Sequence, residues 1–272
     1  MNKSQQPLVS VLMTCYNRER YIGAAMESVL NSNYQNLELI VSDDCSTDST
    51  LSIVQNYALQ DQRVKVYVNG ANLGDYPNRN KAATYATGKY LKYLDSDDLI
   101  YYYGLEVMVS YMEQFPEAGF GLASFVEDER PFPICLSPKE IYQEAFGKFD
   151  HFGRAPGSSI IKRDAFEKLG GFSGKRMIGD TEFWLKAATY YPMVKFPFDL
   201  YWSRVHENRE AVSSYAAREY KKLRKEVIAA ALHDKMCPLS SPEIDQVFLS
   251  LKKRKIKNVI IDSLSPIKKL FT

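Results

Sequence analysis

The chain has 272 residues, which suffices for one large α/β domain or for a catalytic domain with a smaller appendage. Hydrophobic residues make up 45% of it and charged residues 25%, and the 35 basic and 33 acidic side chains leave a net charge of +2. These values exclude wholesale disorder and a global charge for nucleic-acid binding.

The cysteines and the apolar stretches indicate in which cellular compartment the chain is expected. The four cysteines have no CxxC spacing, which argues against a zinc site and against a disulfide scaffold. No apolar stretch approaches the ~18 residues of a membrane span, and the N-terminus has no signal-type apolar core. We therefore expect a cytoplasmic chain with reduced thiols.

The first hundred residues alternate strand and helix patterns with short connections, which predicts parallel strands covered by helices. A nearly continuous apolar run over 8–14 predicts a strand buried on both faces. The other strands expected here are 37–41, 64–68 and 90–94. The helices between them are expected near 24–29, 49–59 and 76–86.

The middle of the chain is less regular. After a helix near 104–115 and a strand near 119–126, residues 127–157 contain four prolines and show little periodicity. Within this segment, Ser137 and Glu140 have the spacing of a capping box, which predicts a short helix. The pattern becomes regular again with a strand at 159–161, a helix at 164–169 and a helix that starts near Asp180.

The last sixty residues are predicted to be helical. A charged helix is expected over 218–232, and a second one begins at Ser241 with Pro242 in its first turn. Apolar side chains recur in the second helix with the spacing of one buried stripe. They are Ile244, Val247, Phe248 and Leu251.

Acidic residues follow two of the expected parallel strands. Asp43 and Asp44 come after the second strand, and Asp95, Asp97 and Asp98 come after the fourth. Ligands of open parallel sheets bind at the carboxyl ends of the strands, so both groups should face one site. Close carboxylates repel each other, and a hard divalent cation would relieve that repulsion. Helix capping is the alternative role for any one of them.

Several common nucleotide and hydrolase motifs are absent. No GxGxxG follows the first strand, and no GxxxxGK[ST] occurs, which disfavours dinucleotide oxidoreductases and P-loop NTPases. The sequence beginning at His206 resembles HExxH but ends in Glu210, and there is no GxSxG. A zinc protease is therefore rejected.

The ordered motifs resemble the inverting glycosyltransferases of family 2, which have the GT-A fold. The resemblance covers about residues 8–210 and departs at Thr14, where many members have proline, and at Gly179, where many have glutamate. The matching stretches are 9–17, 41–48, 72–74 with Arg79-Asn80, 93–98, 170–172 and 179–184.

The resemblance implies an α/β chain with a Rossmann-like, mainly parallel sheet flanked by helices and a helical C-terminal extension. It also implies a GT-A catalytic domain over 1–210, followed by an extension over 211–272. Within the catalytic domain, residues 1–100 would form the nucleotide-binding half and 101–210 the acceptor half.

The resemblance assigns a role to each candidate residue. The nucleotide-sugar donor, expected to be UDP-linked, would contact Thr14, Tyr16, Asn17 and Asp44 with its base, Arg79 along the nucleotide, and Asp95 with its ribose. Asp97, with His206, would hold Mn²⁺ or Mg²⁺, which bridges the diphosphate. Asp180 would be the general base for an acceptor hydroxyl in a single inverting displacement.

Most of these residues have an alternative structural role. The role of Asp180 could be limited to capping its helix, and Arg79 could be a solvated helix residue. Tyr16 and Trp184 could be core aromatics, and for Trp184 we expect this. A lone histidine such as His206 is often structural.

The function implied is transfer of a sugar to a glycan or lipid-linked acceptor in surface polysaccharide synthesis, without a nucleic-acid partner. One alternative is a sugar-nucleotide pyrophosphorylase, which would need a glycine-rich loop after the first strand. Another is a non-catalytic binding module, in which loss of the metal or base carboxylate would be expected.

The tail carries a local positive charge, because residues 251–272 hold seven basic groups and one acid, Asp262. Basic side chains beside an apolar stripe suit binding to an anionic membrane surface, where each basic side chain contributes about 1 kcal/mol of binding free energy. We predict that the full chain sediments with phosphatidylglycerol vesicles at low salt and that a chain ending at Ser250 does not. Such binding would hold the protein at the inner face of the membrane. If the two chains sediment equally, the membrane proposal fails, and the tail is then a solvated helix face or a contact with another subunit.

Overall fold

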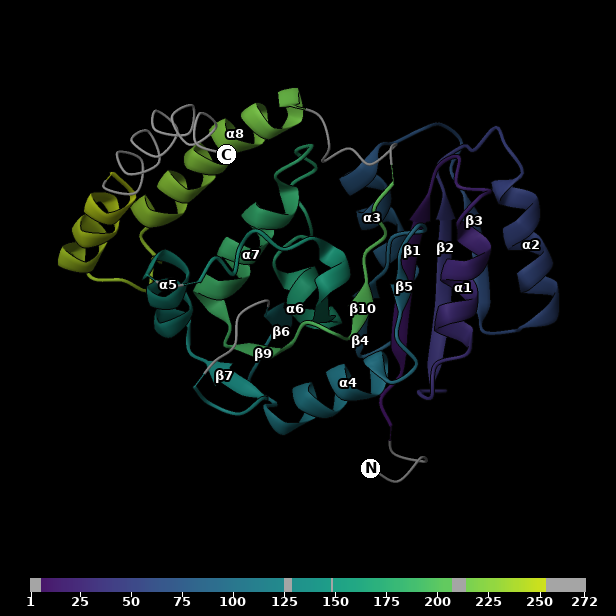
Figure 1. The fold of residues 1–272 in the computed structure, drawn as a ribbon, viewed down its shortest axis with the longest axis horizontal. Helices are drawn as coiled ribbons and strands as arrows, with labels where there is room; N and C mark the ends of the chain where they lie inside the picture. Colours follow the sequence, from purple (N-terminus) through teal and green to yellow (C-terminus); the bar gives the residue numbers. More distant parts are fainter. Residues whose placement is uncertain (1–5, 125–128, 148, 207–213, 253–272) are drawn as a thin grey trace, which may run out of the picture.

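The computed structural model describes residues 6–124, 129–147, 149–206 and 214–252, which form a mixed α/β fold (Figure 1). The strands are β1 (Val9–Cys15), β2 (Leu37–Asp43), β3 (Val64–Val68), β4 (Tyr90–Tyr93), β5 (Leu99–Ile100), β6 (Phe120–Ser124), β7 (Ile134–Leu136), β8 (Ser159–Lys162), β9 (Met193–Pro197) and β10 (Tyr201–Trp202). The α-helices with defined bounds are α1 (Ile22–Leu30), α2 (Thr50–Gln60), α3 (Asp75–Ala83), α4 (Gly104–Gln114), α5 (Pro138–Gly147), α6 (Arg163–Lys168), α7 (Gly179–Tyr190) and α8 (Ser214–His233).

One eight-stranded sheet organises the fold, in the order β3-β2-β1-β4-β8-β6-β9-β7. The pairs among β3, β2, β1 and β4 are parallel, as is β6 with β9, while β8 and β7 run antiparallel to their neighbours. Two further short strands, β5 and β10, pair with each other. The predicted mainly parallel sheet flanked by helices is therefore confirmed.

The sheet separates two hydrophobic cores because successive side chains of a strand point to opposite faces. Along β1, Val9, Val11 and Met13 pack in one core, where side chains of α1 and α4 also lie. Leu12 belongs to the other core, which contains residues of α3, α5, α6 and α7. The continuous apolar run of this strand is thus explained by burial on both faces.

In the second half, the sequence analysis predicted β6 and β8 correctly but missed β7, β9 and β10. In β9, Lys195 interrupts the apolar pattern, yet it is 1% exposed and its ammonium lies 3.3 Å from Glu144. The strands β5 and β10 have two residues each, too few for a periodic signal. The short helix after residue 137 was predicted correctly, because Ser137 and Glu140 exchange the hydrogen bonds of a capping box.

The C-terminal helices cover the second core, as the apolar stripe predicted. Val227, Ile228 and Leu232 of α8 are buried there, and the stripe of the helix over 241–252 packs against the same core. Among the described helices, none is long and apolar enough to cross a membrane. The basic tail beyond residue 252 lies outside the described residues.

Candidate active site

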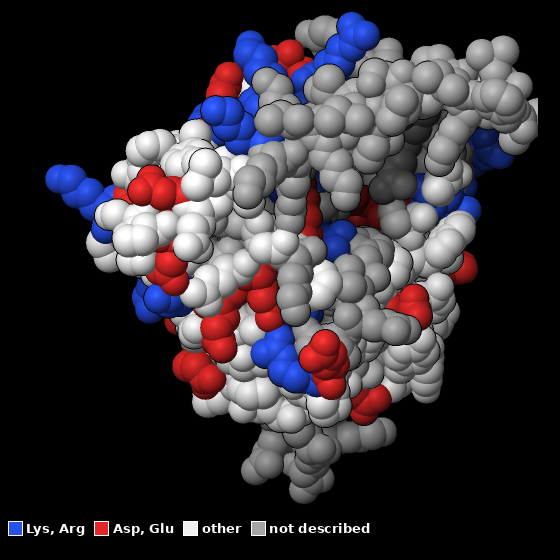
Figure 2. All heavy atoms as spheres, turned by 60° about the vertical axis from the view of Figure 1, so that its left-hand side comes forward, with Lys and Arg blue, Asp and Glu red and all other residues white. Residues whose placement is uncertain are grey.

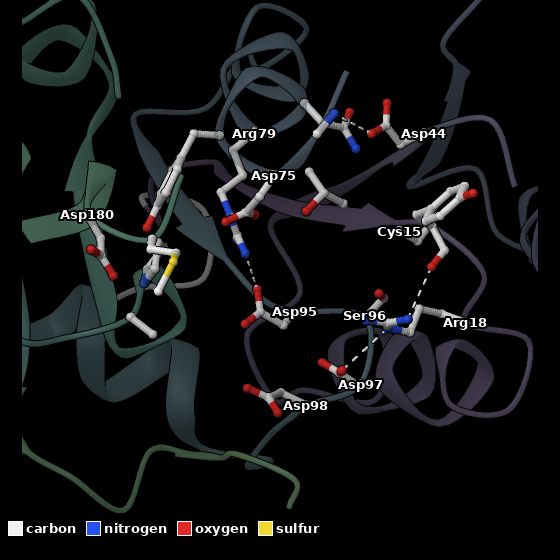
Figure 3. A pocket seen from close by; sticks show the side chains of 18 of the residues that line it. Cys15, Arg18, Asp44, Asp75, Arg79, Asp95, Ser96, Asp97, Asp98 and Asp180 are labelled. Carbon is white, nitrogen blue, oxygen red and sulfur yellow. Dashed lines mark hydrogen bonds and ion pairs between the residues drawn. The ribbon is translucent and has the colours of Figure 1, made fainter. Parts of the chain in front are cut away.

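A cleft of about 940 Å³ opens at the carboxyl ends of β1, β2 and β4 (Figure 3). It exists there because the parallel strands end together and the loops after them splay apart. Seven of the predicted site residues line it: Thr14, Tyr16, Asp44, Arg79, Asp95, Asp97 and Asp180. The other two, Asn17 and His206, are not among its lining residues.

The turn after β1 forms one end of the cleft. Tyr16 is 45% exposed there, so it is not a core aromatic. Asn17 adopts a left-handed φ of 51°, and its Oδ1 accepts a hydrogen bond from the Thr47 amide at 2.8 Å. The Asn17 side chain therefore fastens the turn to the loop after β2.

Asp44 holds the loop that precedes α3. Its carboxylate accepts hydrogen bonds from the backbone amides of Leu73 and Gly74 at 2.8 and 2.9 Å. A third comes from the Asn69 side chain at 2.8 Å. This shapes the cleft wall on the side where the sequence analysis expects the nucleotide base.

Three carboxylates gather directly after β4. Ligand oxygens of Asp95, Asp97 and Asp98 lie within 4.8 Å of one another. A tight turn brings them together, because the Asp98 amide donates to the Asp95 carbonyl at 2.9 Å. Oxygen donors at this separation suit a hard divalent cation such as Mg²⁺ or Mn²⁺.

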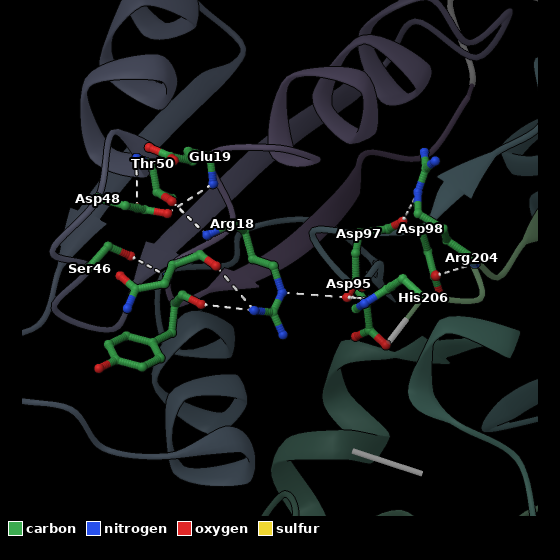
Figure 4. Close-up of polar contacts among 12 residues, drawn as sticks. Arg18, Glu19, Ser46, Asp48, Thr50, Asp95, Asp97, Asp98, Arg204 and His206 are labelled. Atoms are coloured by element: carbon green, nitrogen blue, oxygen red, sulfur yellow. Dashed lines mark hydrogen bonds and ion pairs between the residues drawn. The ribbon is translucent and has the colours of Figure 1, made fainter. Parts of the chain in front are cut away.

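Basic groups approach two of these carboxylates. The Arg18 Nε lies 3.4 Å from Asp97, and the His206 Nε2 lies 2.8 Å from the same carboxylate (Figure 4). An Arg79 Nη2 bonds to Asp95 at 2.7 Å. The predicted mutual repulsion is thus offset in part by the protein's own cations.

Arg79 is not the solvated helix residue that we considered as an alternative. It is 7% exposed and bridges Asp75, at 2.6 Å, and Asp95, at 2.7 Å. Its Nη1 is buried and has no hydrogen-bond partner among the described residues. A cleft-lining guanidinium with a spare donor is suited to an anionic or hydroxyl-rich ligand.

His206 has both a structural and a polar contact. Its ring stacks on Tyr21 with the centroids 5.0 Å apart, while its Nε2 contacts Asp97. Its Nδ1 is buried and has no partner within the described part of the chain. The histidine therefore lies behind Asp97, at the edge of the acidic cluster.

Asp180 lies across the cleft from Asp97 (Figure 3). It is the second residue of α7, whose N-cap is Ile178, so it does not cap the helix. Its carboxylate accepts a hydrogen bond from the Thr181 amide at 2.6 Å, and the Tyr76 side chain lies beside it. Burial raises the pKa of Asp180 to about 6.

Gly179 leaves room for the Tyr76 ring next to Asp180. A Cβ at position 179 would lie 2.8 Å from the Tyr76 ring. That ring is buried, and it packs against Phe172 at a centroid distance of 5.2 Å. The departure from the family pattern at Gly179 therefore creates the space that the tyrosine fills.

Replacing Gly179 with alanine is expected to push Tyr76 away from Asp180. We expect a loss of about 1–2 kcal/mol in the free energy of unfolding from the steric overlap. A Gly70→Ala control has no atom within 4 Å of its new Cβ and should leave stability nearly unchanged. Urea unfolding of both variants checks this, and equal midpoints would show that the ring yields without cost.

Trp184 is a core aromatic, as expected. It is fully buried, and its Nε1 donates to the Arg154 carbonyl at 2.7 Å. Trp184 therefore packs α7 against the core, whereas Asp180 of the same helix lines the cleft.

Several cleft residues were missed by the sequence analysis. Arg18 lies in the turn after the predicted strand 8–14, and Asp75 directly precedes the predicted helix 76–86, so their places at the ends of these elements were the available signal. Tyr220, Lys221 and Arg224 belong to α8, in the segment treated as a separate extension. No motif marks them, because only tertiary packing brings α8 to the cleft.

Comparison with known families supports the resemblance. Residues 10–170 match the model of the glycosyl transferase family 2. An Escherichia coli enzyme described as a UDP-Glc:α-D-GlcNAc-diphosphoundecaprenol β-1,3-glucosyltransferase is 41% identical over 105 residues, which are 39% of this chain and 41% of that one. Alignments with the first curated relatives span about a third to two thirds of those proteins.

Two solved structures share the fold. Staphylococcus aureus TarS residues 1–349 in complex with UDP-GlcNAc align with a TM-score of 0.70 and 21% identity, over 88% of this chain and 70% of that one. The mannosyltransferase PcManGT from Pyrobaculum calidifontis, in complex with GDP-Man and Mn²⁺, aligns with a TM-score of 0.67 and 21% identity, over 91% and 70%. At this identity the likeness concerns the fold alone.

Proposed function

Since the chain belongs to glycosyl transferase family 2, we propose that it transfers a sugar from a nucleotide-diphosphate sugar to a hydroxyl of a lipid-linked glycan. The observation that carries this proposal is the placement of a carboxylate opposite the acidic cluster. Asp180, a half-buried carboxylate, faces the acidic cluster across one cleft. Surface polysaccharide synthesis is the process that we assign to it, and the diphosphoundecaprenol acceptor of the E. coli relative supports this.

The donor would lie along the wall formed by the ends of β1, β2 and β4. We assign the base to Thr14, Tyr16 and Asp44, with Asn17 shaping the turn beneath it, and the ribose to Asp95. Arg79 would use its spare Nη1 on the nucleotide. We propose a UDP-linked sugar, and the UDP-GlcNAc bound by TarS supports that choice.

Asp97, with His206 behind it, would hold Mn²⁺ or Mg²⁺. The oxygen atoms of the cluster fit such a cation in type and in separation, and the Mn²⁺ in PcManGT supports it. When bound, the cation would neutralise charge on the departing diphosphate. Arg18, which lies beside Asp97, would add positive charge there.

Asp180 would act as the general base. With a pKa of about 6, its carboxyl group is mostly ionised at neutral pH and can still accept a proton readily. The Thr181 amide would hold its carboxylate in place, with Tyr76 beside it. The acceptor oxygen would attack from this side, opposite the leaving diphosphate, so the anomeric configuration would invert.

We retain the proposed division of the chain into 1–100, which would bind the nucleotide, 101–210, which would receive the acceptor, and the helical segment 211–272. The cleft lies between the first two. Side chains of α8 also line it, so the third segment would contribute to acceptor binding.

The test is nucleotide diphosphate release from a panel of sugar nucleotides, with and without Mn²⁺. A transferase should release the diphosphate only with a matching donor, and NMR of the product should show an inverted anomeric centre. Formation of sugar phosphate and nucleoside triphosphate from added pyrophosphate would identify a pyrophosphorylase instead. Donor binding without turnover of any acceptor or water would identify a binding module.

A thermal-shift screen comes first, because a donor at 100 times its dissociation constant adds about 2.7 kcal/mol to stability.

A further inference from the structure

The cleft has two differently charged walls. On the wall of the acidic cluster, each lining cation pairs with a carboxylate, Arg79 with Asp75 and Asp95, and Arg18 with Asp97, and Arg79 keeps only its Nη1 without a partner among the described residues. The opposite wall includes α8, which contributes Lys221 and Arg224 to the lining. Figure 2 shows basic side chains gathered at the top of the molecule, where α8 lies, above a recess with acidic groups inside it.

Lys221 and Arg224 face the cleft together because they are three residues apart on one helix face. Within the part of the chain that the structure describes, Lys221 forms no ion pair. Arg224 pairs with Asp150 at 2.5 Å through Nη2, but its Nε is buried and has no hydrogen-bond partner among the described residues. The pair therefore has positive charge and donor capacity to spare.

The helix that carries this pair touches the helix that carries the candidate base. The hydroxyl of Tyr220 contacts the Thr181 hydroxyl at 3.3 Å, and these residues adjoin Lys221 and Asp180 respectively. An acceptor whose hydroxyl reaches Asp180 would extend along α8, since the donor would fill the opposite wall. A negative group on the same sugar would thus come to the two basic side chains.

We propose that Lys221 and Arg224 form a binding site for the phosphate of an acceptor whose sugar is itself linked to a diphosphate. This inference rests on the proposed transferase function and specifies its acceptor class. Phosphate suits this pair because an arginine fork and a lysine ammonium both donate to its oxygens. The other anion expected in the cleft, the donor diphosphate, would lie at Asp97 on the opposite wall.

Calorimetric titration of the full chain tests the site directly. The probes are octyl N-acetyl-α-glucosaminyl diphosphate and the matching octyl glycoside without phosphate, each added with saturating UDP and Mn²⁺ so that the nucleotide site is filled. We expect the diphosphate probe to bind wild type at least about 10-fold more tightly than the glycoside.

Variants of the two residues and of a neighbouring lysine distinguish binding at this specific site from attraction to the positive charge of α8 in general. Lys221→Gln should weaken binding of the diphosphate probe by about 10-fold or more, and Lys221→Glu by more than Lys221→Gln. Lys222→Gln removes the same charge from the next residue, which is exposed and does not line the cleft, and should change nothing. Arg224→Gln should weaken the diphosphate probe in the same way as Lys221→Gln.

Equal affinity of Lys221→Gln and wild type for the diphosphate probe would overturn the inference, as would failure of wild type to prefer that probe. Weaker UDP binding in Lys221→Gln would assign the pair to the donor and would also overturn it. UDP binding with Mn²⁺, measured first, tests the proposed function separately. If UDP fails to bind to wild type, the transferase proposal fails.

Discussion

Turnover by the Asp180→Asn variant is expected to fall by at least about 10²-fold, because asparagine keeps the shape of the side chain but cannot accept the proton. Donor affinity should stay close to that of wild type, since Asp180 faces the acceptor side. Steady-state release of nucleotide diphosphate, together with a titration of UDP and Mn²⁺, measures both quantities.

The same variant is expected to be more stable at neutral pH. The folded protein raises the pKa of Asp180 above its ordinary value of 3.8, to about 6, so it binds the proton more tightly than the unfolded chain. The stability from this group is therefore fully present below pH 3.8 and is lost as the pH rises to about 6. At pH 7.5 the neutral asparagine should add on the order of 1–3 kcal/mol to the free energy of unfolding.

Asp245→Asn is the matched control, because it removes the same charge from an exposed position in the helix over 241–252. It should leave turnover and stability nearly unchanged. In wild type, kcat/KM should decline below pH 6 as Asp180 becomes protonated. A lower melting temperature in Asp180→Asn, with turnover per folded molecule preserved, would refute the role of base.

Loss of the Asp97 carboxylate is expected to abolish the effect of Mn²⁺ on nucleotide binding. Asp97→Ala should bind UDP equally with and without Mn²⁺, whereas Mn²⁺ should tighten binding to wild type by about 10-fold or more. The fold should survive, because the Asp97 side chain contacts Arg18 and His206 at the cleft and is not part of either hydrophobic core.

Asp150→Ala is the control for this experiment, since it removes an acid from the opposite wall of the same cleft. Its response to Mn²⁺ should match that of wild type. Far-UV circular dichroism checks that both variants are folded. If Mn²⁺ tightens UDP binding in Asp97→Ala as in wild type, Asp97 does not hold the cation.

The first half of the fold and the acidic wall of the cleft could be predicted from the sequence because both depend on local signals. Apolar runs of strand length, alternating with helix patterns, specify parallel strands. Acidic residues directly after such strands must then meet at one edge of the sheet. Asp44, Asp95 and Asp97 do line one cleft, and their order along the chain was enough to expect it.

The second half was less predictable because its strands are short or contain buried polar groups. Lys195 is tolerated in β9 because it has partners such as Glu144, 51 residues away, which supplies a carboxylate. No local pattern contains that pairing. The capping box at Ser137 and Glu140 was readable in the same region because its hydrogen bonds span three residues.

The sequence by itself thus determined the family, the parallel sheet and the acidic residues at its edge, since each follows from neighbouring residues and strand direction. Only the tertiary structure decided what surrounds Asp180. Tyr76 packs over Gly179 next to it, and α8 brings Lys221 to the same cleft. Tyr76 and Lys221 come from segments about 100 and about 40 residues away from Asp180 in the sequence. They depend on which helix face packs where, a choice made by the shape of the whole core rather than by any local signal.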